Sequence, residues 1–293
     1  MTGEAAVPLG PIIDSHVHLW DPTRFRMPWL DSNERIGKPL GLADFREHSA
    51  GIEVEGIVYL QVEVSPAYAL LEAQWVADLP ADDPAVLGIV PWAPLEDGDH
   101  ARSFLDAVVA IDPRIKGIRR LIQDEPDDAF CVRPDFIRGV QLLPEYGLSF
   151  DLCIYHRHLK NAITLVRACP DVSFVLDHIS KPDIKAGLRD PWRDELRELA
   201  SFPNVACKIS GAVTEADKEQ WTTADVAPYI EHVIEQFGED RVMFGGDWPV
   251  VLMASPYRRW VATPDEVTAG LSDGAKRKLW NENARRFYRL GDR

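Results

Sequence analysis

The sequence IIDSHVH near the N-terminus ends an apolar run with two histidines, His16 and His18. Side chains two residues apart on an extended strand point to the same side of it. Two imidazoles that converge at a strand end can bind a metal ion or polarise a substrate carbonyl group. A His-X-His sequence also occurs without any function, so its interpretation depends on where this run lies in the fold.

Two later apolar runs also end in ionisable side chains. The run FVL is followed by Asp177 and His178, and the run VMF is followed by Gly245, Gly246 and Asp247. The glycines leave room for close approach, and Asp247 stands where a carboxylate could take a proton from water. The structural alternatives are a core histidine satisfied by the backbone and an aspartate that caps a helix.

The ends of other apolar runs supply further polar candidates for the same site. Either His156 or His158 could reach it, and the sequence does not decide which. One of the two adjacent arginines, Arg119 or Arg120, is expected at the site, and the other is expected in solvent. The remaining candidates for contact with a substrate are Glu63 and Lys208.

These candidates share a position at the ends of eight short β-rich runs. The runs lie near residues 13, 58, 88, 118, 151, 175, 207 and 244. Most are about 25 to 37 residues apart, which suits a strand, a helix and two loops. Helical periodicity marks residues 67–79, 101–111, 158–169 and 226–237. The sequence therefore predicts one α/β domain over residues 1–293, a (β/α)8 TIM barrel whose site lies at the C-terminal strand ends.

The first connection departs from this regular spacing. Residues of about 20–45 are rich in Pro, Gly, aromatic and basic side chains and show no helical periodicity. A long loop after a barrel strand lies at the catalytic face. We expect either a structural flap or a substrate lid that contributes Trp29, Arg24 or Arg26.

The composition narrows the class of protein. A hydrophobic share of 46% supports a sizeable core, and a net charge of −15 repels nucleic acid phosphates. No apolar run approaches the roughly 18 residues of a membrane span, and MTGEAAVPLG lacks the features of a signal peptide. We therefore expect a cytoplasmic protein with no nucleic acid or membrane partner, and its assembly into a homo-oligomer stays open. Buried free thiols are expected at Cys131, Cys153, Cys169 and Cys207.

Taken in order, the histidines and the aspartate at these run ends resemble the pattern of the amidohydrolase superfamily. The segments IIDSHVHLWDP, KGIRRLIQ, VLDHISKP, KISG, MFGGDWPV and WNENARRFYRL more closely resemble its sugar-lactone hydrolase group, which contains L-fuconolactonases and L-rhamnonolactonases. The resemblance covers nearly the whole chain and implies a barrel of the metal-dependent hydrolase type. The group commonly has a serine where this chain has Gly246.

The resemblance implies the hydrolysis of a sugar-acid lactone to the open hydroxy acid. Asp247 would take a proton from the attacking water. His178, with Arg119 or Lys208, would stabilise the oxyanion, while the two histidines of the first run polarise the carbonyl directly or through a metal. Indole rings offer flat faces to a sugar ring or simply pack in the core, and the candidates are Trp29, Trp92 and Trp248.

The fourth run bears on the number of metal ions. Binuclear amidohydrolases carry a carboxylated lysine at the end of strand 4, where this chain has Arg119 or Arg120. A guanidinium group stays charged and cannot ligate a metal. We therefore expect at most one divalent ion, most readily zinc, held by His16, His18 and Asp247, and not essential for activity.

Two other functions stay open at this point. A metal-dependent decarboxylase of a small carboxylic acid would share the paired histidines and the late aspartate, but the arginine near residue 119 and the lactonase-like segments disfavour it. A non-catalytic sugar-acid binding protein is disfavoured because His16, His18, His178 and Asp247 are all intact.

Overall fold

In this computed structural model, residues 10–31, 33–80 and 85–291 are described. Most of the N-terminal segment on which the signal-peptide expectation rests lies outside them. Each of the eight predicted runs contains a strand: β1 Ile12–Val17, β2 Val54–Leu60, β3 Ala85–Val90, β4 Gly117–Ile118, β5 Ser149–Leu152, β6 Phe174–Leu176, β7 Val205–Ile209 and β8 Val242–Phe244.

The strands are parallel and close into a barrel. Hydrogen bonding joins them in the orders β1-β2-β3 and β4-β5-β6-β7-β8. Two isolated parallel bridges connect these groups, between Ile89 and Ile115 and between Val17 and Trp248. The backbone N–H of His18 donates to the Trp248 carbonyl at 2.7 Å across the second junction. The predicted fold class, a single-domain (β/α)8 barrel, is confirmed.

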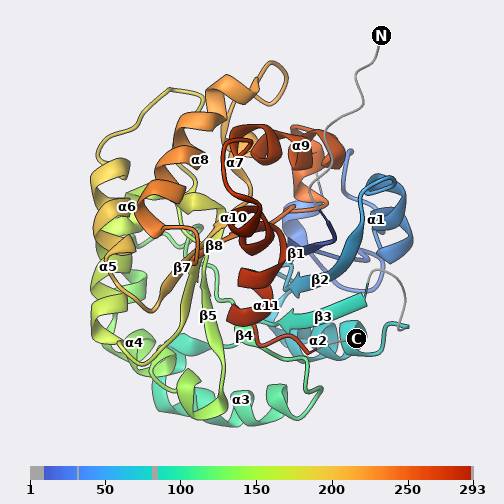
Figure 1. Cartoon of the computed structure of the whole chain (residues 1–293). Coiled ribbons are helices and arrows are strands. Elements are labelled where there is room, and N and C mark those ends of the chain that lie inside the picture. The colour runs from blue at the N-terminus through green and yellow to red at the C-terminus, as the bar shows by residue number, and fades with distance from the viewer. Residues whose placement is uncertain (1–9, 32, 81–84, 292–293) are drawn as a thin grey trace.

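Helices surround the strands (Figure 1). All four segments with helical periodicity contain helices, namely α2 Ala69–Ala77, α3 Arg102–Val109, α5 Leu159–Ala168 and α8 Thr223–Phe237. The other α-helices of the described residues are α1 Leu42–His48, α4 Pro134–Val140, α6 Trp192–Ala200, α7 Ala212–Glu215, α9 Tyr257–Val267, α10 Asp273–Arg277 and α11 Asn283–Phe287.

The C-terminal segment packs against the interior of the barrel. In Figure 1, α11 lies in front of the strands. Ala284, Tyr288 and Leu290 join a buried cluster with inward-facing strand residues such as Val58 and Met243. The apolar interior of a barrel must be shielded from water at each end. This segment covers the end opposite the candidate site.

The long connection between β1 and α1 contains one short 3-10 helix, Pro28–Leu30. It is anchored by apolar side chains, since Phe25, Met27 and Leu30 are buried. The Trp20 indole N–H donates to the Ile36 carbonyl at 3.1 Å. The loop is therefore packed onto the barrel along much of its length, and this fixes its position at the mouth.

Two further expectations concern the whole chain. All four cysteines are buried and free, as expected. Among the described residues, no helix combines the length and the apolar character that crossing a membrane requires.

Candidate active site

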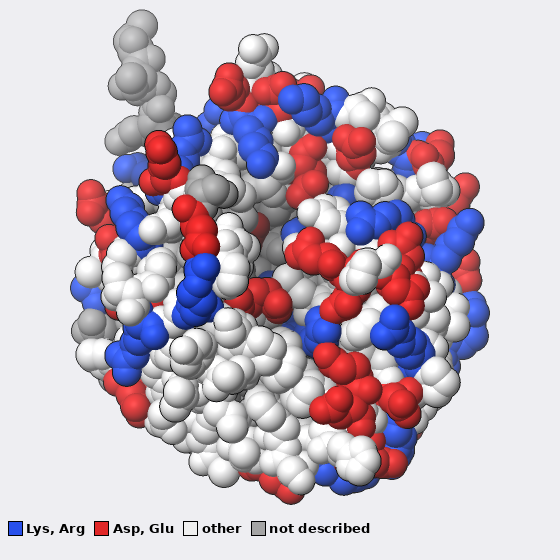
Figure 2. Space-filling view, turned by 180° about the vertical axis from the view of Figure 1, so that it is seen from behind, with Lys and Arg blue, Asp and Glu red and all other residues white. Residues whose placement is uncertain are grey.

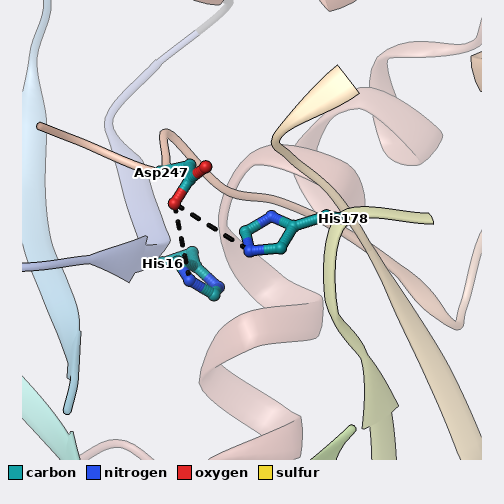
Figure 3. A group of neighbouring side chains, drawn as sticks. All are labelled: His16, His178 and Asp247. Atoms are coloured by element: carbon teal, nitrogen blue, oxygen red, sulfur yellow. Dashed lines mark ion pairs between the residues drawn. The ribbon is translucent and has the colours of Figure 1, made fainter. Parts of the chain in front are cut away.

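Three histidines and one aspartate converge beyond the C-terminal ends of the strands. The Nε2 atoms of His16, His18 and His178 lie 3.7, 3.5 and 3.9 Å from Asp247 Oδ1. Figure 3 shows His16, His178 and Asp247 pointing toward one another. All four residues are at most 5% exposed, so their interactions are strengthened by the exclusion of water.

Asp247 is positioned by close contact between the backbone after β8 and the backbone of β1. Its backbone N–H donates to the His16 carbonyl at 2.8 Å, and it adopts a left-handed φ of 53°. A Cβ at Gly246 would overlap the Asp14 carboxylate and the Tyr257 ring. Glycine at position 246 is therefore required by the packing in this chain, because a serine there would displace these neighbours.

Hydrogen-bond partners fix the tautomers of two imidazoles. His18 Nδ1 lies 2.8 Å from the Leu60 carbonyl, which only accepts, so Nδ1 carries the proton. His16 Nε2 lies 3.2 Å from Arg119 Nη1, which only donates, so this Nε2 is an acceptor. The Nδ1–H of His16 then faces Asp177 Oδ1 at 3.3 Å. Two Nε2 lone pairs therefore point toward the Asp247 carboxylate.

These acceptors fit a single divalent cation. Bonds of about 2.0–2.2 Å around a tetrahedral ion place its ligand atoms roughly 3.3–3.6 Å apart. The two Nε2 atoms of His16 and His18 are 3.2 Å apart, close to the distances that join each of them to Asp247. His16, His178 and Asp247 form one group with metal-binding spacing.

A second group with ligand spacing consists of Cys153, Asp177 and His178. It shares His178 with the first group. Its carboxylate is already paired, because Asp177 lies 3.0 Å from Lys208 Nζ and 3.6 Å from an Arg119 nitrogen. These two fixed cations oppose a second metal ion, so the geometry favours one ion over a pair.

Burial sets the charge state of the histidines. It lowers the pKa of His16 well below the ordinary value, and the nearby Lys208 ammonium adds to this effect. Burial also lowers the pKa of His178 and of His18. For Asp177, burial alone would raise the pKa, but Lys208 and the neighbouring cations hold it below the ordinary value. The imidazoles are therefore neutral near pH 7, with lone pairs available to a metal or a proton.

A cavity of about 490 Å³ opens above this centre. Figure 2 shows a hollow on the face opposite that of Figure 1, with acidic and basic side chains around it. Six of the candidates from the sequence line the cavity: His18, His178, Asp247, Arg119, Glu63 and Trp29. His16 lies directly beneath, fully buried.

The structure decides between the adjacent arginines. Arg119 faces the cavity and donates to the Gln61 carbonyl. Arg120 turns away and pairs with Glu96 at 2.9 Å and Glu125 at 2.6 Å. The expectation that one arginine of the pair reaches the site is therefore met by Arg119, although the other pairs with carboxylates and is not simply solvated.

Lys208 does not line the cavity. It is fully buried beneath His16, with its Nζ 3.3 Å from His16 Nδ1 and 2.6 Å from Asp151 Oδ2. It points into the barrel from within β7, one layer below the strand ends. Lys208 therefore does not make the contact with a substrate in the cavity that the sequence suggested. It contacts His16 and the buried carboxylates below it.

Neither strand-5 histidine lines the cavity. His158 is buried, and its Nε2 lies 3.0 Å from an Asp128 oxygen. His156 is nearer, since its Nδ1 lies 2.9 Å from the Lys181 carbonyl oxygen. Of the two histidines that the sequence left open, His156 contacts the cavity residue Lys181, and His158 pairs with Asp128 away from the cavity.

Of the aromatic and basic candidates from loops, Trp29 alone lines the cavity. Trp92 packs edge-on against Phe104, and Trp248 is fully buried against Phe45. The loop cations also lie elsewhere: Arg24 stacks over Phe25, and Arg26 pairs with Asp31. The Trp29 indole N–H donates to the Val62 carbonyl at 2.9 Å, which joins the loop to the end of β2.

Sequence reasoning missed several polar and aromatic residues that line the cavity. They share positions in loops after the strand ends and are Trp20, Gln123, Asp124, Tyr155, Lys181, Glu215 and Lys218. Lys181 carried a weak signal, since it follows the His178 run by three residues. Glu215 ends the four-residue helix α7, which is too short for periodicity to reveal.

Comparison with known proteins identifies the family of the chain. The family described as Amidohydrolase matches residues 13–290. The chain is 30% identical over 289 residues to an L-fucono-1,5-lactonase of Burkholderia multivorans, covering 95% of this chain and 96% of that protein. A crystal structure of an amidohydrolase from Burkholderia multivorans with bound zinc has a TM-score of 0.85 at 27% identity, covering 96% of this chain and 100% of that chain.

A more distant structure has a different chemistry. The 2,6-dihydroxybenzoate decarboxylase from Rhizobium is 15% identical with a TM-score of 0.64, covering 96% of this chain and 99% of that chain, a likeness of fold alone. The family match extends across all eight strands and the four converging residues. This chain belongs to the amidohydrolase family.

Proposed function

We propose that this protein hydrolyses a sugar-acid lactone to the open hydroxy acid. The observation that carries the proposal is the Asp247 carboxylate held within 4 Å of three buried imidazoles, at the base of a cavity of about 490 Å³. A cavity of this size accommodates a small ring. The lactonase name of the Burkholderia multivorans relative supports this choice of substrate.

The proposed reaction needs a general base, stabilisation of an oxyanion and a proton for the leaving oxygen. Asp247 accepts a proton from water as the water oxygen bonds to the lactone carbonyl carbon. The oxyanion that forms is stabilised by Arg119 and His178, which both line the cavity. Collapse breaks the bond to the ring oxygen, and the protonated Asp247 returns its proton to that alkoxide. The product is one hydroxy acid, so atoms and protons balance.

One divalent ion, zinc by preference, is part of the proposal. His16, His18 and Asp247 would hold it, which leaves His178 to the oxyanion, and Asp177 supports His16 from behind through the Nδ1 contact of 3.3 Å. When bound, zinc supplies Lewis-acid polarisation of the carbonyl oxygen and lowers the pKa of water. The zinc-bound crystal structure of an amidohydrolase relative supports the choice of metal.

The cavity lining carries charges of both signs. The carboxylates Glu63, Asp124, Glu215 and Asp247 line it together with the cations Arg119, Lys181 and Lys218. Hydroxyl groups both donate and accept hydrogen bonds, so a polyhydroxylated ring suits side chains of both signs.

The test is a panel of aldonolactones with five- and six-membered rings at neutral pH, with acid release followed by a pH indicator. We expect at least one lactone to be hydrolysed by the protein and not by its Asp247→Asn variant. The same preparations are incubated with hydroxybenzoates, and release of carbon dioxide is measured. Decarboxylation without any lactone hydrolysis would overturn the proposal.

A further inference from the structure

The segment that follows β6 forms a left-handed turn of four residues without glycine. His178, Ile179, Ser180 and Lys181 have φ values of 52°, 50°, 60° and 47°. Each such residue costs roughly 1–2 kcal/mol relative to the right-handed conformation. Strain of this kind persists only where the surroundings hold it and often marks a functional position.

Neighbouring residues hold this turn in place. The buried Trp192 indole N–H donates to the Ile179 carbonyl at 2.9 Å and lies 3.0 Å from the Ser180 hydroxyl. On the other side, a Cβ at Gly211 would lie 2.6 Å from His178 Nδ1, so only glycine leaves room for the ring. Ile179 and Ser180 face the core, whereas His178 and Lys181 both line the cavity.

The Lys181 ammonium has few partners. Its Nζ donates to Gln123 Oε1 at 2.5 Å and lies 5.3 Å from the centre of the Tyr155 ring. No carboxylate of the described residues lies within ion-pair distance of it. Since an ammonium group has three donors, the remaining N–H groups are available to a ligand in the cavity.

The Glu215 carboxylate lines the same cavity from the end of the short helix α7, which follows β7. Its side chain makes no hydrogen bond or ion pair with another residue of the described part of the chain. Burial raises the pKa of Glu215, while the charges of Lys181 and Lys218 act in the opposite direction. A donor after β6 and an acceptor after β7 thus line the same cavity without being paired with each other.

We propose that Lys181 and Glu215 are specificity residues that recognise hydroxyl groups on the ring of the substrate, Lys181 by donating to them and Glu215 by accepting from them. This inference rests on the proposed function and adds which side chains select the sugar. A hydroxyl group both donates and accepts, so a ring with neighbouring hydroxyls satisfies both side chains at once. A lactone without hydroxyl groups would cover both side chains and leave them unpaired, which costs binding free energy.

The experiment couples each side chain to each hydroxyl. The best aldonolactone of the panel and its monodeoxy analogues are assayed with wild type, Lys181→Met and Glu215→Gln. A hydrogen bond to a charged group is worth about 1.5–3 kcal/mol, so each variant is expected to lower kcat/KM for the parent lactone about 10- to 150-fold. With the analogue that lacks the matching hydroxyl, the same substitution should change kcat/KM less than about twofold.

Matched controls are Lys185→Met and Glu219→Gln, whose side chains are exposed and do not line the cavity. Thermal unfolding of every variant shows whether the fold is kept, and Glu215→Gln provides the test if Lys181→Met is unstable. Equal losses with the parent and with every deoxy analogue would overturn the inference and leave lactone hydrolysis standing. Absence of turnover with every lactone would overturn the proposed function as well.

Discussion

Two layers of the candidate active site, one fully buried and one partly exposed, differ in how their charges are satisfied. The floor, made of Asp151, Asp177, Lys208 and Tyr288, is fully buried and internally paired: Lys208 Nζ contacts both carboxylates, and the Tyr288 hydroxyl donates to Asp151 at 2.5 Å. The wall, made of Lys181 and Glu215, lines the cavity without an internal ion pair. The paired groups of the floor hold neighbouring side chains in place, whereas Lys181 and Glu215 keep hydrogen-bonding capacity that a ligand could use.

The position of His16 shows what the floor does. Its Nδ1–H faces the Asp177 carboxylate at 3.3 Å, and Lys208 Nζ lies 3.0 Å from that carboxylate, so the ring is held from below while its Nε2 faces the cavity side. Tyr288 comes from the C-terminal segment, which therefore reaches the site through Asp151 and Lys208. The order of the reaction centre thus depends on chain segments that never touch the cavity.

The largest effect is expected between the two layers, at the reaction centre itself. Asp247→Asn removes the proposed general base without changing the shape of the side chain, so kcat should fall about 10² to 10⁴-fold. The midpoint of thermal unfolding should stay near that of wild type. Near-normal kcat in a folded Asp247→Asn protein would remove this residue from the role of base.

The floor is expected to respond to substitution through stability. Lys208→Met leaves Asp151 and Asp177 buried without their shared cation, so the free energy of unfolding should fall by about 3–5 kcal/mol. Urea unfolding measures this loss. Lys181→Met, which breaks no internal ion pair, is the matched variant and should lose about 1 kcal/mol or less. Equal losses for the two lysines would erase the distinction between floor and wall.

Two buried carboxyl groups sharpen the comparison, because cations decide the direction of their pKa shifts. Asp177, beside Lys208, has a pKa below the ordinary value. Burial raises the pKa of Glu72 to about 7, and its partners among the described residues are two neutral donors, the Tyr59 hydroxyl and the Val62 N–H. The two groups should therefore affect the pH dependence of stability with opposite signs.

Glu72 gives the measurable case. Its pKa is higher in the folded than in the unfolded protein, so the folded state keeps the proton and loses stability as pH rises from about 4.5 to about 7. Glu72→Gln removes this titration, so its stability relative to wild type should improve by about 2.5 kcal/mol between pH 5 and pH 8. Urea unfolding at both pH values measures the change. The exposed Glu219→Gln control should show none.

The sequence predicted the residues at or just beyond the ends of strands. His16 is the next-to-last residue of β1, His178 and Asp247 follow β6 and β8, and parallel strand ends must meet at one mouth of a barrel. Lys208 is likewise the next-to-last residue of β7, so its position in the run did not reveal that its side chain lies beneath His16 and not in the cavity. Lys181 depends on a left-handed turn held by Trp192, a tertiary contact that leaves no local pattern in the sequence.

The smallest effect is expected from removal of the metal, and Arg119 is the reason. Its guanidinium nitrogen lies 3.2 Å from His16 Nε2, a lone pair that a metal ion would also use. A fixed positive charge about 4 Å from a cation costs roughly 4 kcal/mol even at an effective dielectric constant near 20, so the ion should be weakly held. Metal analysis should find at most one equivalent of zinc per chain, and dialysis against a chelator should lower kcat less than Asp247→Asn does.

Arg119→Met should tighten zinc binding as it weakens catalysis, because it removes both the repulsion and an oxyanion donor. Two tightly held equivalents, with activity dependent on both, would show that the arginine does not limit the site to one ion.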